Sequence, residues 1–227
     1  GEMYTDQQGM CPFDIPEAFD RDEIPVVVEA YRRATANAFD AGFDAVELHC
    51  TSGYLPAQFL CSGTNQRTDE YGGGPANRIR FVLDVLDAMI RVDGPGRVGI
   101  RICPDNPFND LYDEQPQQTF EYLLEEVEGL DLAYVHVIRF PGRVDNIELA
   151  QRYFGDRLVA NESYDFEEAQ AAVAGGEVIA VSFGRPFIAN PDLVDRWRVG
   201  LPLAEFDPRT LYSPGAEGYC DYPRATA

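Results

Sequence analysis

The sequence FDAVELHC, residues 43–50, decides how the chain is interpreted, because it is a short apolar run that ends in polar residues. A run of this length is typical of a buried strand. The segment before it, from Pro25 to Asp40, places apolar residues on one helical face, and Gly42 is a suitable stop for that helix. The two segments together predict a helix followed by a strand.

The same alternation continues to the C-terminal part of the chain. Further strands are predicted at 97–103, 132–139, 157–163 and 178–185, with helices at 76–91, 115–129, 146–153, 165–174 and 192–199. Strands buried on both faces, alternating with amphipathic helices, predict a parallel α/β fold. The first strand is not followed by a Gly-x-Gly-x-x-Gly motif, and polar residues sit at the C-terminal strand ends. Both features favour a (β/α)8 TIM barrel over a doubly wound sheet.

A closed barrel of this type has eight strands, whereas the sequence predicts five strand–helix units. Residues 1–24 are predicted to be an irregular lead-in, with no room for three further units. Residues 202–227 are predicted to form an irregular tail over the site. We therefore expect 1–227 to be a single domain, the C-terminal portion of a barrel. Its first three strands would come from an N-terminal part of the native protein or from another chain, and a homo-oligomer is a further expectation.

The composition excludes several classes of function. The formal net charge is −21, which disfavours nucleic acids and anionic membranes as partners. All 18 basic residues are arginines, so Schiff-base chemistry and a P-loop lysine are excluded. An acidic chain without lysine suggests adaptation to high salt, where charge repulsion is screened. No run approaches the roughly 20 apolar residues of a membrane span, and no signal peptide is evident, so we expect a cytoplasmic protein.

Cysteine and histidine are too few and too scattered for a metal site. The five cysteines form no Cys-x-x-Cys pair, and the two histidines, His49 and His136, are far apart in the chain. This pattern predicts reduced thiols and no bound metal. His136 lies in the middle of its strand and is expected to fill the barrel interior.

His49 and Tyr54 lie where the first strand passes into a loop. A neutral imidazole can donate a hydrogen bond to a carbonyl or nitro oxygen, and a tyrosine hydroxyl can protonate a carbanion. The alternative is a core histidine beside a packing tyrosine. Arg101, at the end of the second strand, needs an anionic or electron-rich partner. A flavin pyrimidine edge would suit it, as would a carboxylate across the barrel.

The ends of the last two strands carry residues suited to binding a phosphate. Asn161, Glu162 and Ser163 follow one strand, and Gly184 and Arg185 end the next. In TIM barrels these loops commonly bind phosphate through backbone N–H groups, helped by a positive side chain. Because a carboxylate repels a phosphate, the Glu162 side chain is expected to point away.

Several ordered blocks of the sequence resemble the Old Yellow Enzyme family, most closely its bacterial-type branch of pentaerythritol tetranitrate, morphinone and N-ethylmaleimide reductases. The blocks are AGFDAVELHCTSGYLPAQFL (41–60), TNQRTDEYGGGPANRIRFVLDVLDA (64–88), RVGIRICP (97–104), LAYVHV (132–137), FGRPFIANPDL (183–193) and GAEGYCDYP (215–223). The resemblance implies a barrel that binds FMN and takes electrons from NADH or NADPH. The flavin would then pass a hydride to an α,β-unsaturated carbonyl or nitro compound.

The resemblance also implies roles for single residues. Tyr54 matches the proton donor and His49 the first member of the pair that anchors the substrate. Arg101 matches the arginine that contacts the flavin, and Gly184 and Arg185 match the phosphate grip. The tail with Tyr212 and Tyr219 is similar to the segment that folds over the site, with Tyr212 expected to contact substrate. The second anchor, normally His or Asn, is Ser52 here.

Two other functions stay open at this point. The chain could be a non-catalytic binding or assembly fragment of such a barrel. It could also be a phosphate-handling lyase or isomerase on the same scaffold, although it lacks the lysine or metal ligands that such enzymes commonly use.

Overall fold

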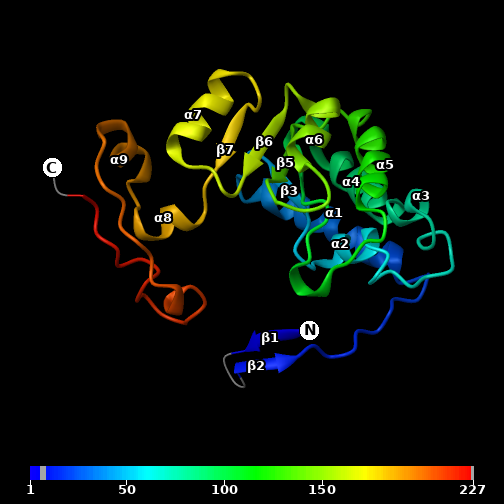
Figure 1. The fold of residues 1–227 in the computed structure, drawn as a ribbon. Coiled ribbons are helices and arrows are strands. Elements are labelled where there is room, and N and C mark those ends of the chain that lie inside the picture. Colours follow the sequence, from blue (N-terminus) through cyan, green and yellow to red (C-terminus); the bar gives the residue numbers. More distant parts are fainter. Residues whose placement is uncertain (6–8, 226–227) are drawn as a thin grey trace.

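The computed structural model describes residues 1–5 and 9–225, with side chains from residue 9 onward and for Gly1 and Glu2. Five strands form one parallel sheet whose order follows the chain (Figure 1). They are β3 (Val46–Cys50), β4 (Val98–Ile102), β5 (Tyr134–Ile138), β6 (Leu158–Asn161) and β7 (Ala180–Ser182). The parallel α/β fold with five strand–helix units is thereby confirmed.

Helices precede and connect the strands and cover one face of the sheet, whereas the last two, α8 and α9, follow β7 and lie away from the sheet (Figure 1). They are α1 (Ile24–Asp40), α2 (Leu55–Leu60), α3 (Pro75–Arg78), α4 (Arg80–Asp93), α5 (Pro116–Glu128), α6 (Asn146–Phe154), α7 (Phe166–Ala174), α8 (Arg185–Ala189) and α9 (Leu193–Val199), with 3-10 turns at Pro95–Arg97, Phe108–Asp110 and Pro208–Thr210. The helix predicted at 76–91 is divided into α3 and α4. The strand predicted at 178–185 is only three residues long, because Arg185 already begins a helix with Pro186 in its first turn. No helix in the described ranges is both long and apolar enough to cross a membrane.

The lead-in is not irregular, contrary to the prediction for residues 1–24. β1 (Glu2–Thr5) and β2 (Gly9–Pro12) pair in antiparallel fashion. In Figure 1 this pair lies apart from the parallel sheet, at the end of an extended segment that leads to α1. Short strands with little apolar periodicity carry a weak sequence signal, which is why the pair was missed.

The two faces of the sheet differ in character. The face toward the helices is fully apolar: Leu48, Ile100, Val135 and Leu158 are each at most 2% exposed. The opposite face carries a polar set, which consists of Glu47, His49, Arg101, Tyr134, His136, Asn161 and Ser182. The expectation that the strands are buried on both faces holds fully for the face toward the helices, whereas on the opposite face only His136 and Asn161 of the polar set are buried and the others are half-buried. We call this second surface the inner face.

The inner face is concave. On β5, His136 donates through Nδ1 to Glu47 Oε2 of β3 at 2.9 Å, and its Nε2 forms a hydrogen bond of 2.7 Å with Ser182 Oγ of β7. Neighbouring strands lie about 4.8 Å apart, so one imidazole on a flat sheet would not reach side chains two strands away on both sides. The sheet is therefore curved as in a barrel wall. His136 is 8% exposed and lies in the interior, as expected.

Candidate active site

His49 and Arg101 are neighbours on the inner face, near the C-terminal ends of their strands. The register pairs His49 with Arg101 and Arg101 with His136. Burial lowers the pKa of His49, and the positive charge of Arg101 lowers it further. His49 is therefore neutral at neutral pH, which is the form that can donate one hydrogen bond without carrying a charge.

Tyr54 lies against His49 at the start of α2. The two ring centroids are 4.8 Å apart with the planes tilted by 59°. Tyr54 is 58% exposed, so its hydroxyl is open to a molecule entering from solvent. Both rings line a cavity of about 410 Å³ beside β3, together with Tyr31 of α1. The structure thus brings the predicted pair into contact.

Ser52 is held by the loop after β4, which carries Asn106 and Asn109. The amide of Asn106 donates to Thr51 Oγ1 at 2.9 Å and to Ser52 Oγ at 3.3 Å. Asn109 donates to the Ser52 carbonyl oxygen at 2.7 Å. Ser52 itself has φ 57°, a left-handed conformation that these contacts stabilise. The sequence did offer a signal for Asn106, because it lies in the loop after β4 just as Ser52 and Tyr54 lie after β3.

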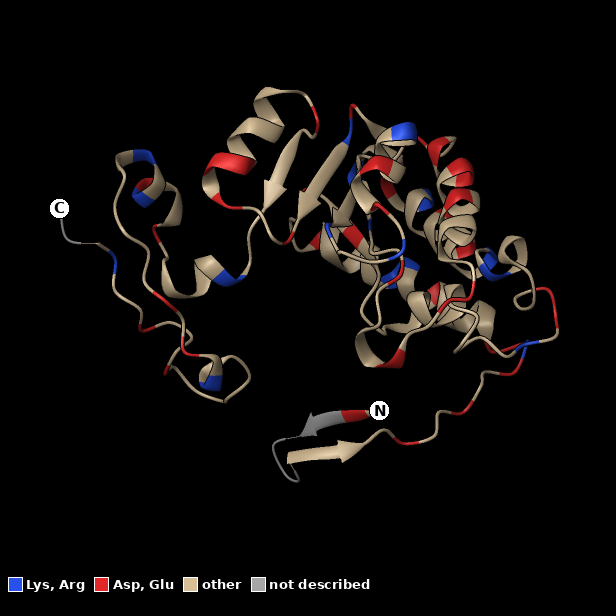
Figure 2. Cartoon of the chain, in the orientation of Figure 1, with Lys and Arg blue, Asp and Glu red and all other residues tan. Residues whose placement is uncertain are grey.

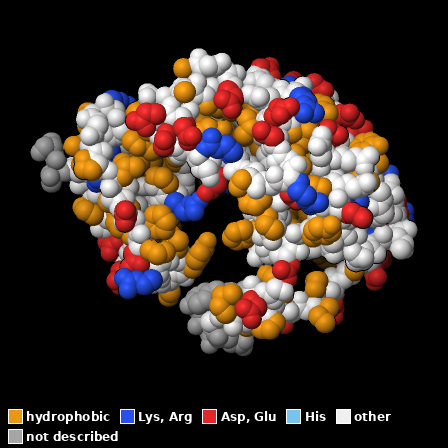
Figure 3. Space-filling view, in the orientation of Figure 1, with side chains coloured by type: hydrophobic (Ala, Val, Ile, Leu, Met, Phe, Trp, Pro, Cys, Tyr) orange, Lys and Arg blue, Asp and Glu red, His pale blue; other side chains and the backbone are white. Residues whose placement is uncertain are grey.

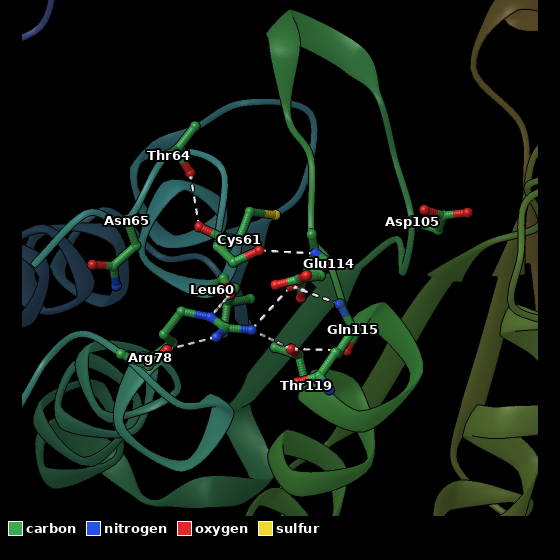
Figure 4. A network of polar contacts seen from close by, with 12 residues as sticks. Leu60, Cys61, Thr64, Asn65, Arg78, Asp105, Glu114, Gln115 and Thr119 are labelled. Atoms are coloured by element: carbon green, nitrogen blue, oxygen red, sulfur yellow. Dashed lines mark hydrogen bonds and ion pairs between the residues drawn. The ribbon is translucent and has the colours of Figure 1, made fainter.

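A buried ion pair supports this loop (Figure 4). Arg78 of α3 donates to Asp113 Oδ1 at 3.0 Å, to Thr119 Oγ1 at 2.7 Å and to the Leu60 carbonyl at 2.7 Å. Arg78 and Asp113 are 4% and 3% exposed. The network joins α2, α3, α5 and Asp113, which lies in the same loop after β4 as Asn106.

Arg101 has an amide as its partner, whereas its position predicts a flavin edge or a carboxylate. Its guanidinium donates to Asn161 Oδ1 at 2.5 Å, and Asn161 in turn donates to the Ser182 carbonyl at 2.9 Å. The Arg101 Nε is buried and has no hydrogen-bond acceptor within the described chain. An unsatisfied buried donor of this kind costs about 1–3 kcal/mol, and a bound acceptor would remove that cost.

Glu162 does not point away from the predicted phosphate grip, so that expectation is wrong. Its carboxylate forms an ion pair with the guanidinium of Arg185. Both residues line a cavity of about 690 Å³ at the ends of β6 and β7, with Ser163, Gly184 and part of the tail around Leu203. No atom lies within 4 Å of the position that a Cβ on Gly184 would take, so the wall is open there.

The space-filling view shows a hollow at the C-terminal ends of the strands, bordered by apolar side chains and, on one side, by basic and acidic ones (Figure 3). Acidic residues are spread over the helices and the loops of the molecule (Figure 2). Tyr212 and Tyr219 in the tail are 85% and 77% exposed, and no contact joins Tyr212 to His49 or Tyr54 among the described residues. The structure does not bring Tyr212 into the site.

Thiol and metal chemistry find no support in this region. Burial raises the pKa of Cys103, which lies close to Thr51, to about 12. A thiol with such a pKa is a poor nucleophile at neutral pH. Within residues 1–5 and 9–225, no three metal-binding side chains cluster.

Comparison with known proteins decides which family this geometry represents. A model of the NADH:flavin oxidoreductase / NADH oxidase family matches residues 2–204. The chain belongs to this family. A protein of Leishmania infantum described as a probable flavin mononucleotide-dependent alkene reductase is 44% identical to it over 216 residues, which cover 93% of this chain.

Solved structures of Old Yellow Enzyme relatives have the same fold. Morphinone reductase in complex with tetrahydroNAD superposes with a TM-score of 0.90 and 43% identity over 99% of this chain. The old yellow enzyme from Trypanosoma cruzi gives a TM-score of 0.93 at 32% identity over 100% of this chain. The chain spans 59% of the Leishmania protein and 63% of each of these two structures. It therefore represents part of the barrel of this Old Yellow Enzyme family.

The residues present fit a flavin. The orphaned Nε of Arg101 offers a donor on the inner face, and Gly184 leaves room for close approach of a ligand. The cavity beside Arg185 is large enough for part of a nucleotide. Two carboxylates in the lining of this cavity, Glu162 and Glu205, oppose a phosphate, and Glu162 is paired with Arg185.

Proposed function

We propose that this chain is the catalytic portion of an NADH- or NADPH-dependent FMN oxidoreductase that reduces activated carbon–carbon double bonds. The observation that carries the proposal is the contact between His49 and Tyr54 beside Arg101, on the concave face of a parallel sheet. The names of the alkene reductase and morphinone reductase relatives support it.

Three groups of residues would hold the cofactor. Arg101, steadied by Asn161, would bind the pyrimidine edge of the isoalloxazine. Ser163, Gly184 and Arg185 would bind the phosphate. Bound FMN would supply a hydride to the β-carbon of the substrate.

The chain itself would orient and protonate the substrate. The neutral imidazole of His49 donates a hydrogen bond to a carbonyl or nitro oxygen and polarises the double bond. Tyr54, whose ring contacts that imidazole, delivers the proton to the α-carbon. The Ser52 hydroxyl already accepts a hydrogen bond from Asn106, so it would help His49 to anchor the substrate from a restricted position. Tyr212 would join the substrate only after a movement of the tail.

We also propose a substrate class, a cellular location and partners for this protein. The substrate would be a small enone or nitro compound. We place the protein in the cytoplasm, away from nucleic acid and membranes, on the basis of its net charge of −21. A homo-oligomer or a second chain would pair with β3 and β7, which are the two edges of the described parallel sheet.

Spectroscopy and one substitution test the function. Purified protein should be yellow, lose its flavin absorbance with NADH or NADPH and regain it with cyclohexenone. Tyr54→Phe should slow the recovery by about 100-fold or more, in line with general acid catalysis, whereas Tyr122→Phe on α5 should leave it unchanged. Equal rates for Tyr54→Phe and the original protein would remove the proton donor.

A colourless protein that binds no flavin would favour the second candidate, a non-catalytic assembly fragment. The observation in its favour is that the chain spans only about three fifths of its relatives.

A further inference from the structure

The pairing of Glu162 with Arg185 places a carboxylate on the arginine that the proposed function assigns to the flavin phosphate. Glu162 belongs to the loop after β6, and Arg185 begins α8 after β7. Their side chains are 37% and 57% exposed, so both can be reached by a ligand in the cavity that they line.

The backbone directs Glu162 toward this position. Glu162 and Ser163 have φ values of 70° and 59°, both left-handed. Such a conformation is uncommon for residues other than glycine and costs on the order of 1 kcal/mol or more at each position. A loop held this way presents the glutamate to Arg185 across the mouth of the cavity.

The remaining charges around the cavity do not compensate. Its lining contains one arginine, Arg185, and two glutamates, Glu162 and Glu205, so its formal charge is −1. The nearby Arg139 is already engaged, because its guanidinium stacks on the Tyr164 ring at 3.6 Å and donates to Glu168 at 3.1 Å. A phosphate dianion would therefore meet an arginine that is already neutralised.

We propose that Glu162 determines the flavin specificity of this site by competing with the phosphate for Arg185. The inference rests on the proposed function and deepens it. A phosphorylated flavin must displace the carboxylate or bind beside it, whereas a flavin without phosphate leaves the ion pair intact. The site consequently distinguishes FMN from riboflavin only weakly, and loss of the Glu162 charge restores a preference for FMN.

Titration of FMN and riboflavin, followed by flavin fluorescence, measures this preference without turnover. In Glu162→Gln the dissociation constant of riboflavin divided by that of FMN should rise about tenfold, because one negative charge next to the phosphate dianion is removed. Riboflavin affinity should change by less than about twofold, because a neutral ligand leaves the electrostatics of the pair unaltered. Glu162→Gly, which also accommodates the positive φ, should shift the ratio at least as far.

Glu205→Gln is the matched control, because it removes a carboxylate from the same cavity that is not paired with Arg185. Its shift should be clearly smaller than that of Glu162→Gln. An unchanged FMN-to-riboflavin ratio in both Glu162 variants, with circular dichroism showing that they are folded, would overturn the inference and leave flavin binding intact. If neither flavin binds to the original protein or to any variant, the proposed function fails, and this inference fails with it.

Discussion

At the residue scale, the protonation of His49 follows from its surroundings. Burial is the largest cause of its lowered pKa, and Arg101 on the neighbouring strand adds to the effect, while Glu47 opposes it. The imidazole can therefore act as a hydrogen-bond donor without becoming a cation. This matters for a substrate anchor, which must polarise an oxygen without losing its own proton.

The pKa of His49 gives a prediction with a definite sign. The folded protein should titrate this imidazole below the ordinary value of 6.5. Between the two pKa values the unfolded chain binds more protons, so the contribution of His49 to stability is present above about pH 6.5 and declines as the pH falls through the folded pKa. NMR titration of the imidazole protons, assigned with His49→Gln, measures the midpoint. A midpoint at or above 6.5 would contradict the burial argument.

The buried pair of Arg78 and Asp113 predicts a large effect on stability. Arg78→Met should lower the free energy of unfolding by about 3–5 kcal/mol, because it leaves the Asp113 carboxylate buried without its charge partner. Arg91→Met, which removes an exposed pair with Asp87, should cost less than about 1 kcal/mol. Urea unfolding of both variants provides the comparison. Equal losses would mean that burial of the first pair is irrelevant.

At the scale of the elements, the loop between α2 and α3 is held by side chains and by close backbone contacts. Arg67 pairs with Asp69 and donates to the Phe19 carbonyl at 2.6 Å, which fastens the loop to the segment before α1. Asn65 donates to the carbonyls of Phe59 and Tyr71, both at 2.7 Å. The loop is therefore an ordered part of the barrel wall.

Two glycines of this loop should differ in their response to substitution by alanine. A Cβ on Gly72 would collide with the backbone carbonyl of Arg67, so Gly72→Ala should destabilise the protein by about 1–3 kcal/mol. Gly74 has φ −70° and open space, so Gly74→Ala should be neutral or stabilise by about 0.5 kcal/mol. Thermal unfolding measures both. A loss of stability in Gly74→Ala as large as that in Gly72→Ala would refute the steric explanation.

At the scale of the whole molecule, the net charge of −21 sets how stability depends on salt. The acidic residues are spread over helices and loops and repel one another through solvent (Figure 2). We propose that the protein is adapted to high salt. Its Tm should rise between about 0.1 M and 1 M NaCl, where the Debye length shortens from about 10 Å to about 3 Å. KCl should act equally, because screening depends on ionic strength. A Tm that stays constant or falls would contradict the proposal.

Sequence reasoning was most successful where periodicity carries the signal. The five strands, the helices between them and the position of His49, Arg101 and Asn161 at strand ends all follow from alternation of apolar and polar residues. Periodicity did not predict the N-terminal hairpin, the short helix α2 or the contact of Asn106 with Ser52, because short elements and loops have little periodicity.

By itself, the sequence determined the parallel α/β architecture, the family and the set of polar residues at the strand ends, because these depend on local pattern and composition. Only the tertiary structure decided which side chains contact one another. Arg78 meets Asp113 across 35 positions of the chain, and Glu162 meets Arg185 from a different loop. Such pairings depend on loop conformation and side-chain rotamers, which have no periodic trace in the sequence. They decide whether the arginine at the predicted phosphate site is free or is already paired with a carboxylate.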